Sequence, residues 1–393
     1  MPRLLIGAMT WLVITFGMAF ADQTARSGES GRSVEAPGHA RITGPCGFVF
    51  PADHADHPDH RTEWWYWTGN LADQAGRRYG FQLTFFRRRL SPPNADAARP
   101  EPSSPWRTSQ LYLAHAAVSD IEAREHRADQ IMARGAAGLA GVERDKSGAA
   151  RVFLKDWSAR IGPDRHELRA QSRGSGETGG FTLRLTLAPE KPAVAHGQGG
   201  YSRKGKRPES ASCYYSFTRL RAEGSIEMDG RIVDVTGLAW MDHEYSSELL
   251  EPGLVGWDWF SLQFDDRTEL MAFFLRDTLG GPSHASGGSF VDPTASVIQL
   301  NQGDMRLDVL DYWTSPRTGA RYPSGWRLQV PALDLDVTIR PAMADQEMRT
   351  GKTTGVTYWE GSVRAAGAVR GRSAQGRGYV EMTGYAGSLD APL

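Results

Sequence analysis

The chain has 393 residues, enough for two domains with separate hydrophobic cores. Its formal net charge is -1, from 45 basic and 46 acidic residues, so charge gives no reason to expect nucleic acid or an anionic membrane as partner. Cys46 and Cys213 are the only cysteines, which excludes a disulfide-dependent scaffold. Whether these two form one disulfide stays open.

The N-terminus has the pattern of a secretory signal. Arg3 precedes an apolar run over residues 4–18, and Ala19-Phe20-Ala21 supplies small residues for cleavage. An uncleaved membrane anchor is the alternative, because the run is nearly long enough to span a bilayer. We therefore expect a signal peptide over residues 1–21, cleavage near Ala21 and a secreted or periplasmic protein. Residues 22–45 are polar and lack aromatic residues, which predicts a flexible leader.

Short strands with period-two alternation dominate the chain after Cys46. Residues 64–71 and 79–88 flank Asp73-Gln74-Ala75-Gly76, which predicts a hairpin. Residues 123–133 are read as a short helix of weak periodicity, and residues 197–212, with their basic run, as a solvated loop. Further strands are predicted at residues 111–118, 181–187, 231–240, 257–264, 270–276, 326–330, 333–339, 358–363 and 378–383.

Many short strands with few helices predict an all-β fold, and closing the sheets into barrels would remove exposed edges. The number of strands suits two tandem antiparallel β-barrels better than one. Pro252-Gly253 interrupts the chain near residues 246–253. We therefore place an N-terminal domain at residues 46–248 and a C-terminal domain at residues 249–393.

Asp242 and Glu244 follow Leu238 and Trp240 on one face of a predicted strand. Carboxyl groups beside an indole on an apolar face would be desolvated, which raises their pKa and suits a general acid. The other interpretation is a turn at the strand end with solvated Asp242 and Glu244. The residues themselves favour neither.

Two further aromatic segments carry faces of mixed chemistry. Trp257 and Trp259 share a face with a hydroxyl and an amide, which is typical of a cavity lining. In the run from Arg61 to Gly69, successive side chains would point to opposite faces of the predicted strand. One face would carry Trp64 and Tyr66, and the other would carry Glu63, Trp65 and Trp67. Only one of these two faces can line a cavity.

His54, His57 and His60 recur at every third residue with aspartates between them. Their spacing matches no standard metal motif, and the nearby prolines favour a solvated loop, so we assign no metal. His115 is interpreted as a core or cavity-wall histidine, with water orientation as the alternative. No Gly-x-Ser-x-Gly sequence is present, which argues against a serine hydrolase of the α/β type.

These segments together resemble the AttH and carotenoid 1,2-hydratase family, two-barrel lipocalin-like proteins often labelled as predicted secreted hydrolases. The resemblance covers most of the chain after residue 46. It is carried by His57-Pro-x-x-Arg-Thr-Glu-Trp-Trp-Tyr-Trp-Thr-Gly-Asn-Leu71, Tyr79-Gly-Phe-Gln-Leu-Thr-Phe-Phe-Arg87, Ala114-His115, Gly138-Leu-Ala-Gly141, Tyr214-Tyr-Ser-Phe-Thr-Arg-Leu220, Trp240-Met-Asp-His-Glu-Tyr-Ser246, Gly256-Trp-Asp-Trp-Phe-Ser-Leu-Gln263, Tyr358-Trp-Glu-Gly361 and Gly378-Tyr-Val-Glu-Met-Thr-Gly-Tyr385.

The resemblance implies that Asp242 occupies the position of the aspartate that protonates an isolated alkene in the hydratases. Trp240 stands where those enzymes carry tyrosine, so this chain looks closer to the AttH-like branch. An apolar site would keep Asp242 protonated, and indole faces would stabilise the resulting carbocation. Neither a metal nor an organic cofactor is required.

Our leading hypothesis is therefore an exported protein with an apolar cavity in the N-terminal domain, acting on a hydrophobic polyene or lipid-like substrate by hydration or a related hydrolytic step. The alternative is a non-catalytic carrier of apolar ligands, serving an export system or the cell envelope. The candidate catalytic residues are Asp242, His243 and Glu244. The candidate substrate-binding residues are Glu63, Trp64, Trp65, Tyr66, His115, Tyr214, Trp240, Trp257 and Trp259.

Overall fold

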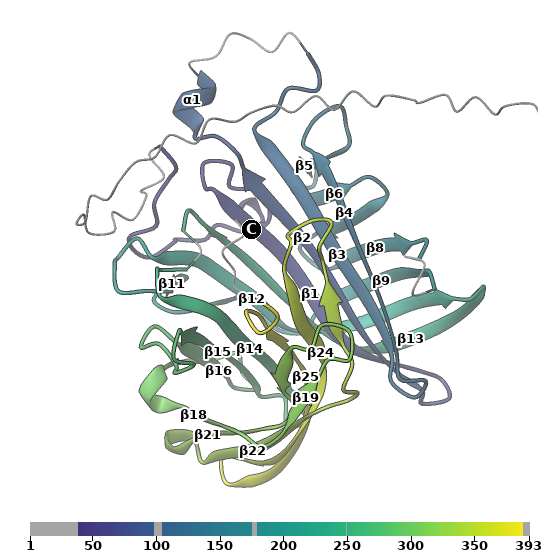
Figure 1. Cartoon of the computed structure of the whole chain (residues 1–393), viewed down its shortest axis with the longest axis vertical. Helices are drawn as coiled ribbons and strands as arrows, with labels where there is room; N and C mark the ends of the chain where they lie inside the picture. Colours follow the sequence, from purple (N-terminus) through teal and green to yellow (C-terminus); the bar gives the residue numbers. More distant parts are fainter. Residues whose placement is uncertain (1–37, 98–103, 175–178, 249, 388–393) are drawn as a thin grey trace, which may run out of the picture. The chain divides into compact units, whose positions relative to one another are not determined.

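The computed structural model describes residues 38–97, 104–174, 179–248 and 250–387 (Figure 1). All of them belong to one compact unit that spans residues 36–393. The structure is almost entirely β, and within the described ranges no helix is long and apolar enough to cross a membrane. The predictions of a signal peptide and of a leader up to residue 37 lie outside the described residues.

The first sheet has 13 antiparallel strands and curls into a nearly closed barrel, in which β6 packs against β2, β3 and β4. Its path runs β4-β3-β2-β1-β13-β12-β9-β8-β7-β6-β5, and β10 and β11 pair with β12. The strands are β1 (Thr62–Asp73), β2 (Arg78–Arg89), β3 (Gln110–Asp120), β4 (Glu125–Arg134), β5 (Ala140–Arg144), β6 (Ala150–Leu154), β7 (Trp157–Ile161), β8 (His166–Ser172), β9 (Phe181–Pro189), β10 (Val194–Ala195), β11 (Tyr201–Arg203), β12 (Ala211–Met228) and β13 (Arg231–Ser246).

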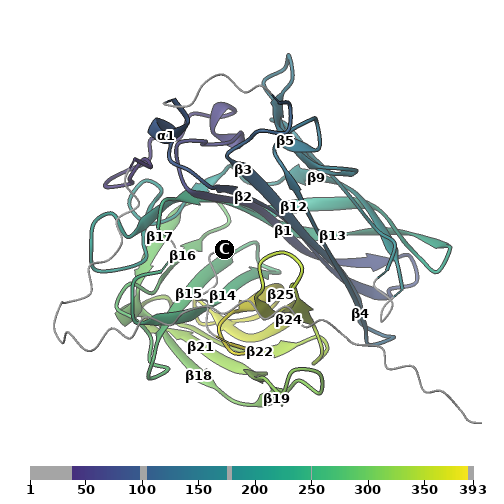
Figure 2. The ribbon, with the colours of Figure 1, turned by 45° about the horizontal axis from the view of Figure 1, so that its top comes forward.

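The second sheet has 10 strands in the path β17-β16-β15-β14-β25-β24-β22-β21-β18, with β23 paired to β24; β19 and β20 form a separate pair. Figure 2 shows this sheet below the first. The strands are β14 (Leu254–Phe264), β15 (Glu269–Asp277), β16 (Gly287–Val291), β17 (Val297–Asn301), β18 (Arg306–Val309), β19 (Tyr312–Thr314), β20 (Arg321–Pro323), β21 (Trp326–Val330), β22 (Leu335–Pro341), β23 (Glu347–Arg349), β24 (Thr357–Val369) and β25 (Arg372–Met382). The short helices are α1 (Pro93–Ala97), η1 (Ala52–His54), η2 (Gln302–Asp304) and η3 (Pro331–Leu333).

Three buried clusters follow from the alternation of side chains along these strands. One fills the first barrel and includes Trp65 and Trp67, and a second, around Phe260, lies against the second sheet. The third lies where the two sheets face each other, and includes Tyr66 of β1 and Trp259 of β14. The central strands of both sheets are therefore buried on both faces.

Most of the predicted strands are confirmed, including the hairpin of β1 and β2. The predicted helix at residues 123–133 is wrong: residues 125–133 belong to β4, which pairs with β3 and has too few apolar side chains for a clear period. The long strand β12 was missed because a bulge between Phe217 and Leu220 interrupts its alternation. The first sheet ends at Ser246 and the second begins at Leu254, on either side of Pro252-Gly253.

The N-terminal segment joins the first barrel earlier than expected. Ile42 is buried against Cys213 and Tyr245, so this part of the segment that was expected to be a flexible leader lies against the first barrel. Cys46 and Cys213 form a disulfide, with their Cα atoms 5.8 Å apart. This bond ties the segment before β1 to β12.

Candidate functional site

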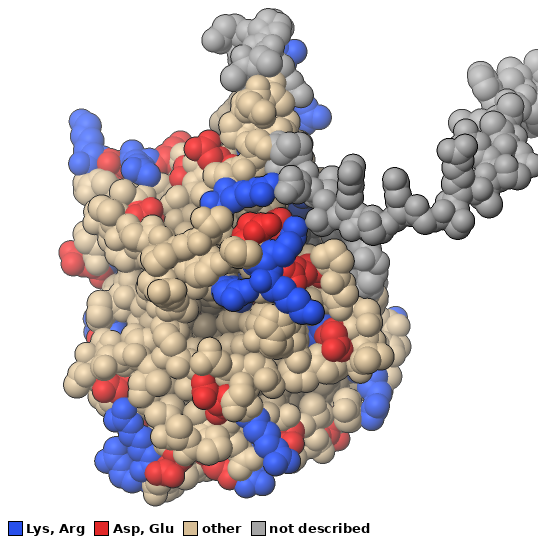
Figure 3. All heavy atoms as spheres, turned by 90° about the vertical axis from the view of Figure 1, so that its left-hand side faces the viewer, with Lys and Arg blue, Asp and Glu red and all other residues tan. Residues whose placement is uncertain are grey.

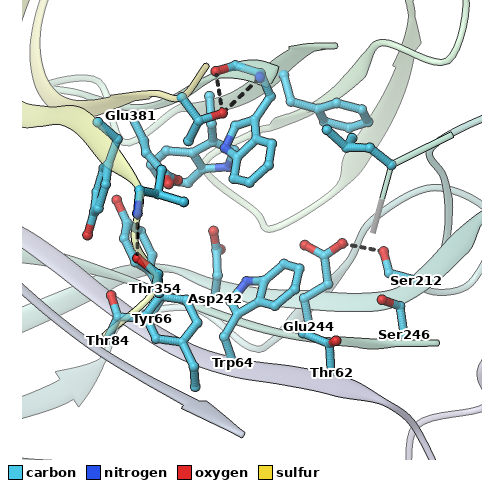
Figure 4. A pocket seen from close by; sticks show the side chains of 18 of the residues that line it. Thr62, Trp64, Tyr66, Thr84, Ser212, Asp242, Glu244, Ser246, Thr354 and Glu381 are labelled. Atoms are coloured by element: carbon cyan, nitrogen blue, oxygen red, sulfur yellow. Dashed lines mark hydrogen bonds between the residues drawn. The ribbon is translucent and has the colours of Figure 1, made fainter. Parts of the chain in front are cut away.

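A pocket lies between the two sheets, and strands of both sheets line it. Its cavity volume is about 130 Å³. Figure 4 shows Asp242 pointing into this space beside Trp64, with Glu381 across from it. The cavity expected in the N-terminal domain is not formed by that domain alone. Indoles and other large side chains fill the first barrel, and the second sheet supplies part of the pocket wall. The pocket uses the outer face of β1 and β13 instead.

Asp242 is buried, and its three hydrogen-bond partners are uncharged. The Tyr214 hydroxyl donates to Oδ2 over 2.8 Å, the Trp240 indole donates to Oδ1 over 2.6 Å, and the Ser216 hydroxyl also donates to Oδ1. Burial raises the pKa of Asp242 to about 7. The three hydrogen-bond donors favour the ionised form and so lower the pKa, but burial has the larger effect. The carboxyl can therefore both give and accept a proton near neutral pH.

Glu360 of β24 and Glu381 of β25 form a carboxyl pair in the same pocket. They are opposite each other in the strand register, and both line the cavity. Burial raises the pKa of Glu381 to about 7. Burial and the neighbouring Glu381 carboxyl raise the pKa of Glu360 well above its ordinary value. Two carboxyl groups this close, one buried and one half-buried, do not both ionise, so the pair retains a proton.

Glu244 does not share the environment of Asp242. Its carboxylate accepts a hydrogen bond from the hydroxyl of Ser212 (Figure 4). The carboxylate also lies 3.2 Å from Nζ of Lys204, whose ammonium group is 4.2 Å from the ring centroid of Phe273. The ion pair engages this carboxylate, which argues against Glu244 as the acid. The predicted solvated loop at residues 197–212 is thus wrong at Lys204, which lines the pocket.

Aromatic side chains form a large part of the remaining wall. Trp64, Trp257 and Trp259 come from β1 and β14, and Tyr66 meets Trp259 edge to face at 5.3 Å between ring centroids. Figure 3 shows one hollowed face of the molecule, bordered mainly by uncharged residues with Lys and Arg on one side. Aromatic walls combined with polar groups at defined positions are the usual design of a site for a hydrophobic ligand.

His115 lies in the wall as a neutral histidine. Its Nδ1 atom is 2.9 Å from the hydroxyl of Tyr358, and its Nε2 atom is 2.8 Å from Oγ1 of Thr353. Burial lowers the pKa of His115 to about 3. Both ring nitrogens are engaged by protein groups, so the geometry favours the cavity-wall interpretation over the orientation of water.

Three predicted site residues face away from the pocket. Glu63, Trp65 and His243 point into the first barrel, because successive residues of a strand point to opposite faces. His243 Nε2 is 2.8 Å from Oε1 of Glu63 and so cannot assist Asp242 directly. Assigning these three residues to one site with Asp242 was therefore incorrect. Trp240 and Tyr214 are buried and reach the site through Asp242, although Tyr214 also lines the cavity.

The histidine-rich segment before β1 is not a solvated loop. His54 is buried and its Nδ1 atom lies 2.8 Å from the hydroxyl of Tyr215, while His57 contacts Glu63 and Asp53. The sequence interpretation rested on the prolines and polar residues of this segment. It did not predict that side chains at the opening of the first barrel would form hydrogen bonds with the imidazoles.

Sequence reasoning also missed Glu360 and Glu381 as site residues. Both are in segments quoted for the family resemblance, Tyr358-Trp-Glu-Gly361 and Gly378-Tyr-Val-Glu-Met382. An acidic residue inside an otherwise apolar strand was the available signal. Only the packing of the second sheet on the first brings these carboxyl groups to the pocket that holds Asp242.

The fold and the pocket define a class of protein with two lipocalin-like β-barrels and a site between them. The chain belongs to the AttH-like family, whose model matches residues 41–385. A solved protein from Nitrosomonas europaea, described as an AttH, is 34% identical, with a TM-score of 0.75 over 88% of this chain and 99% of that one.

Kievitone hydratase from Nectria haematococca is similar in structure, with a TM-score of 0.60 and 14% identity over 90% of this chain and 98% of that chain. At that identity the likeness shows a shared fold and nothing further. Among curated proteins no relative is found.

Proposed function

We propose that this protein is an exported enzyme that adds water to an isolated carbon–carbon double bond at the apolar end of a hydrophobic small molecule. The observation that carries the proposal is the buried carboxyl of Asp242, with a pKa raised to about 7, on the wall of an aromatic pocket. A carboxyl acid must stay protonated near neutral pH to protonate an alkene, and burial provides this. Kievitone hydratase shares this fold, so the fold itself is compatible with a hydration reaction.

The reaction would proceed in two steps. Asp242 gives its proton to one carbon of the double bond, whose electron pair forms the new C–H bond and leaves a tertiary carbocation on the other carbon. The faces of Trp64, Trp257 and Trp259 stabilise this cation through their quadrupoles. Water then adds to the cation, and its extra proton returns to the Asp242 carboxylate. The sum is alkene plus water giving a tertiary alcohol, with the acid regenerated.

The carboxyl pair of Glu360 and Glu381 would orient the attacking water. Together these residues present both protonated and ionised oxygens to the cavity, so a water molecule can donate to one and accept from the other. The cavity is smaller than the roughly 300–1,000 Å³ of sites that enclose a whole drug-sized ligand. We therefore expect it to bind the reacting end of a larger molecule, such as a branched prenyl group.

Export is part of this proposal and rests on two observations. The N-terminal sequence has the charge, apolar run and small residues of a signal peptide. The disulfide between Cys46 and Cys213 suits an oxidising compartment.

The proposal is tested by incubating the purified protein with a panel of prenylated phenols and isoprenoid alkenes in ¹⁸O-labelled water. Mass spectrometry should detect products that have gained one labelled water. Asp242→Asn should lower the rate by at least ~100-fold, the usual contribution of a general acid. Asp258→Asn, which alters a buried acid outside the pocket lining, is the control and should keep most of the activity.

Two results would count against hydration. Undiminished turnover in Asp242→Asn would remove the proposed acid. Stoichiometric binding of an alkene without labelled product across the whole panel would instead favour the carrier alternative.

A further inference from the structure

We propose that His57, Glu63 and His243 form a binding site for one divalent transition-metal ion. This His57–Glu63–His243 cluster lies inside the first barrel, on the opposite face of β1 and β13 from the pocket. Nδ1 of His57 and Nε2 of His243 each lie 2.8 Å from Oε1 of Glu63. The three potential ligand atoms all lie within 4.8 Å of one another.

These separations are close to those around a bound ion. Zinc–nitrogen and zinc–oxygen bonds are about 2.0–2.2 Å long, so neighbouring ligand atoms are roughly 3.0–3.5 Å apart. The two separations from Oε1 of Glu63 are slightly shorter than that spacing, and the two imidazole nitrogens lie within 4.8 Å of each other, so the imidazoles would have to move around the carboxylate to share an ion. Glu63 and His243 are on adjacent paired strands, and Glu63 lies opposite Tyr245 in the register, so the backbone holds two of the ligands in place.

Each of the three residues is also fixed by a partner on its far side. Nε2 of His57 lies 3.0 Å from Oδ1 of Asp53, and Nδ1 of His243 lies 2.9 Å from the hydroxyl of Tyr215. The second oxygen of Glu63 accepts a hydrogen bond of 2.8 Å from Nε of Arg87. Outer partners of this kind orient metal-bound imidazoles and carboxylates, and they leave the inner atoms directed at one point.

The charge and the donor atoms select the type of ion. Two carboxylates, Glu63 and Asp53, outweigh the guanidinium of Arg87, so the cluster attracts a metal ion once His57 has released any proton that it holds. Two nitrogens and one oxygen suit zinc, iron(II) or cobalt(II), whereas calcium and magnesium prefer oxygen ligands only. The side chain of His57 is 17% exposed, while those of Glu63 and His243 are inaccessible, so an ion would enter on the His57 side.

The same contacts also form a hydrogen-bond network that holds the segment around His57 against the barrel. That network is the competing interpretation, and it makes the opposite prediction about metal. If the contacts serve only to hold the segment, added zinc has no reason to bind stoichiometrically or to raise the thermal stability.

Metal binding is tested on the full chain after removal of metal by a chelator. We expect calorimetry with Zn²⁺ to show one site per chain, and thermal unfolding to shift upward with Zn²⁺ as binding to the folded state requires. Added Co²⁺ should give visible absorption bands of a site with nitrogen and oxygen ligands. A chain that binds neither ion with defined stoichiometry overturns the proposal.

Variants assign the site to these residues. His57→Ala and Glu63→Gln should each weaken Zn²⁺ binding by more than ~100-fold, beyond the loss typical of outer partners. His60→Ala, in the same segment, and His284→Ala, an exposed histidine, are matched controls and should bind Zn²⁺ as the unaltered chain does. Unchanged affinity in both His57→Ala and Glu63→Gln would place any bound zinc elsewhere. The outcome does not depend on whether the pocket is a hydratase site.

Discussion

The indole Nε1 of Trp240 donates a hydrogen bond of 2.6 Å to Oδ1 of Asp242. Trp240 stands at the position where the resemblance implies a tyrosine in the carotenoid hydratases. Here a different donor meets the same carboxyl, while the hydroxyl of Tyr214 binds the other oxygen. The proton affinity of Asp242 therefore depends on two aromatic donors as well as on burial.

Removal of the indole donor should raise the pKa of Asp242 further. A hydrogen bond to a charged group contributes about 1.5–3 kcal/mol, so Trp240→Phe should raise the pKa by roughly one to two units. Carbon-13 NMR titration of labelled aspartate carboxyls measures the shift. Trp259→Phe, which removes a donor to the Tyr214 hydroxyl and not to Asp242, is the control and should change the pKa less. An equal or larger shift in that control would contradict the assignment.

Asp242 should make the fold less stable at higher pH. Its pKa is about 3.8 in the unfolded chain and about 7 in the folded protein, so between these values the folded state holds a proton that the unfolded state releases. Its stabilising contribution is complete below pH 3.8 and is lost as the pH rises through 7. Relative to the unaltered chain, Asp242→Asn should therefore gain about 2 kcal/mol of unfolding free energy between pH 5.5 and pH 8.

Denaturant unfolding at the two pH values measures this gain for Asp242→Asn. Asp164→Asn removes an exposed carboxyl and serves as the control, for which the two pH values should give the same difference from the unaltered chain. A stability difference for Asp242→Asn that is independent of pH would show that the folded carboxyl titrates normally.

His115 should make the fold less stable at lower pH, the opposite of the effect of Asp242. Burial lowers the pKa of His115 from 6.5 to about 3. Below pH 6.5 the imidazole therefore takes up a proton in the unfolded chain but stays neutral in the folded protein. The stabilising contribution of the neutral His115 is complete above pH 6.5 and is lost as the pH falls. Between pH 7 and pH 5 the unaltered chain should lose about 2 kcal/mol more than His115→Gln. Urea unfolding at both values tests this, and equal losses in the two chains would contradict it.

Alternation along single strands was readable from the sequence. It predicted that Trp64 and Tyr66 share a face, and that Trp240 and Asp242 share another, because the period of two is local. It did not decide which face of β1 meets a cavity. That choice depends on the second sheet, which docks on the outer face of β1 and β13 and leaves the inner face to the barrel core.

Contacts between distant segments were beyond the sequence pattern. Glu381 reaches the pocket of Asp242 from a strand about 140 residues later, and no local period reports such packing. His57 and His243 are likewise far apart in the chain and meet at Glu63. The histidine spacing of three residues was therefore judged as a linear motif, although its partner histidine is on another strand.

Trp64 and Trp65 provide a direct test of the two faces of β1. Trp65 is fully buried in the first barrel, whereas Trp64 is half-buried at the pocket. Trp65→Ala should cost about 3–5 kcal/mol of unfolding free energy, as large-to-small core substitutions do. Trp64→Ala should cost less than half of that, because part of the indole is already solvated. Denaturant unfolding of both variants measures the contrast.

Ligand binding should show the reverse order. Trp64→Ala should weaken binding of a prenylated phenol by ~10-fold, the equivalent of about 1.4 kcal/mol, because it removes an aromatic wall of the pocket. Trp65→Ala, measured at a temperature where it remains folded, should bind as the unaltered chain does, since its indole packs inside the barrel and donates to the carbonyl of His54. Weaker binding in Trp65→Ala than in Trp64→Ala would place the ligand inside the first barrel instead of between the sheets.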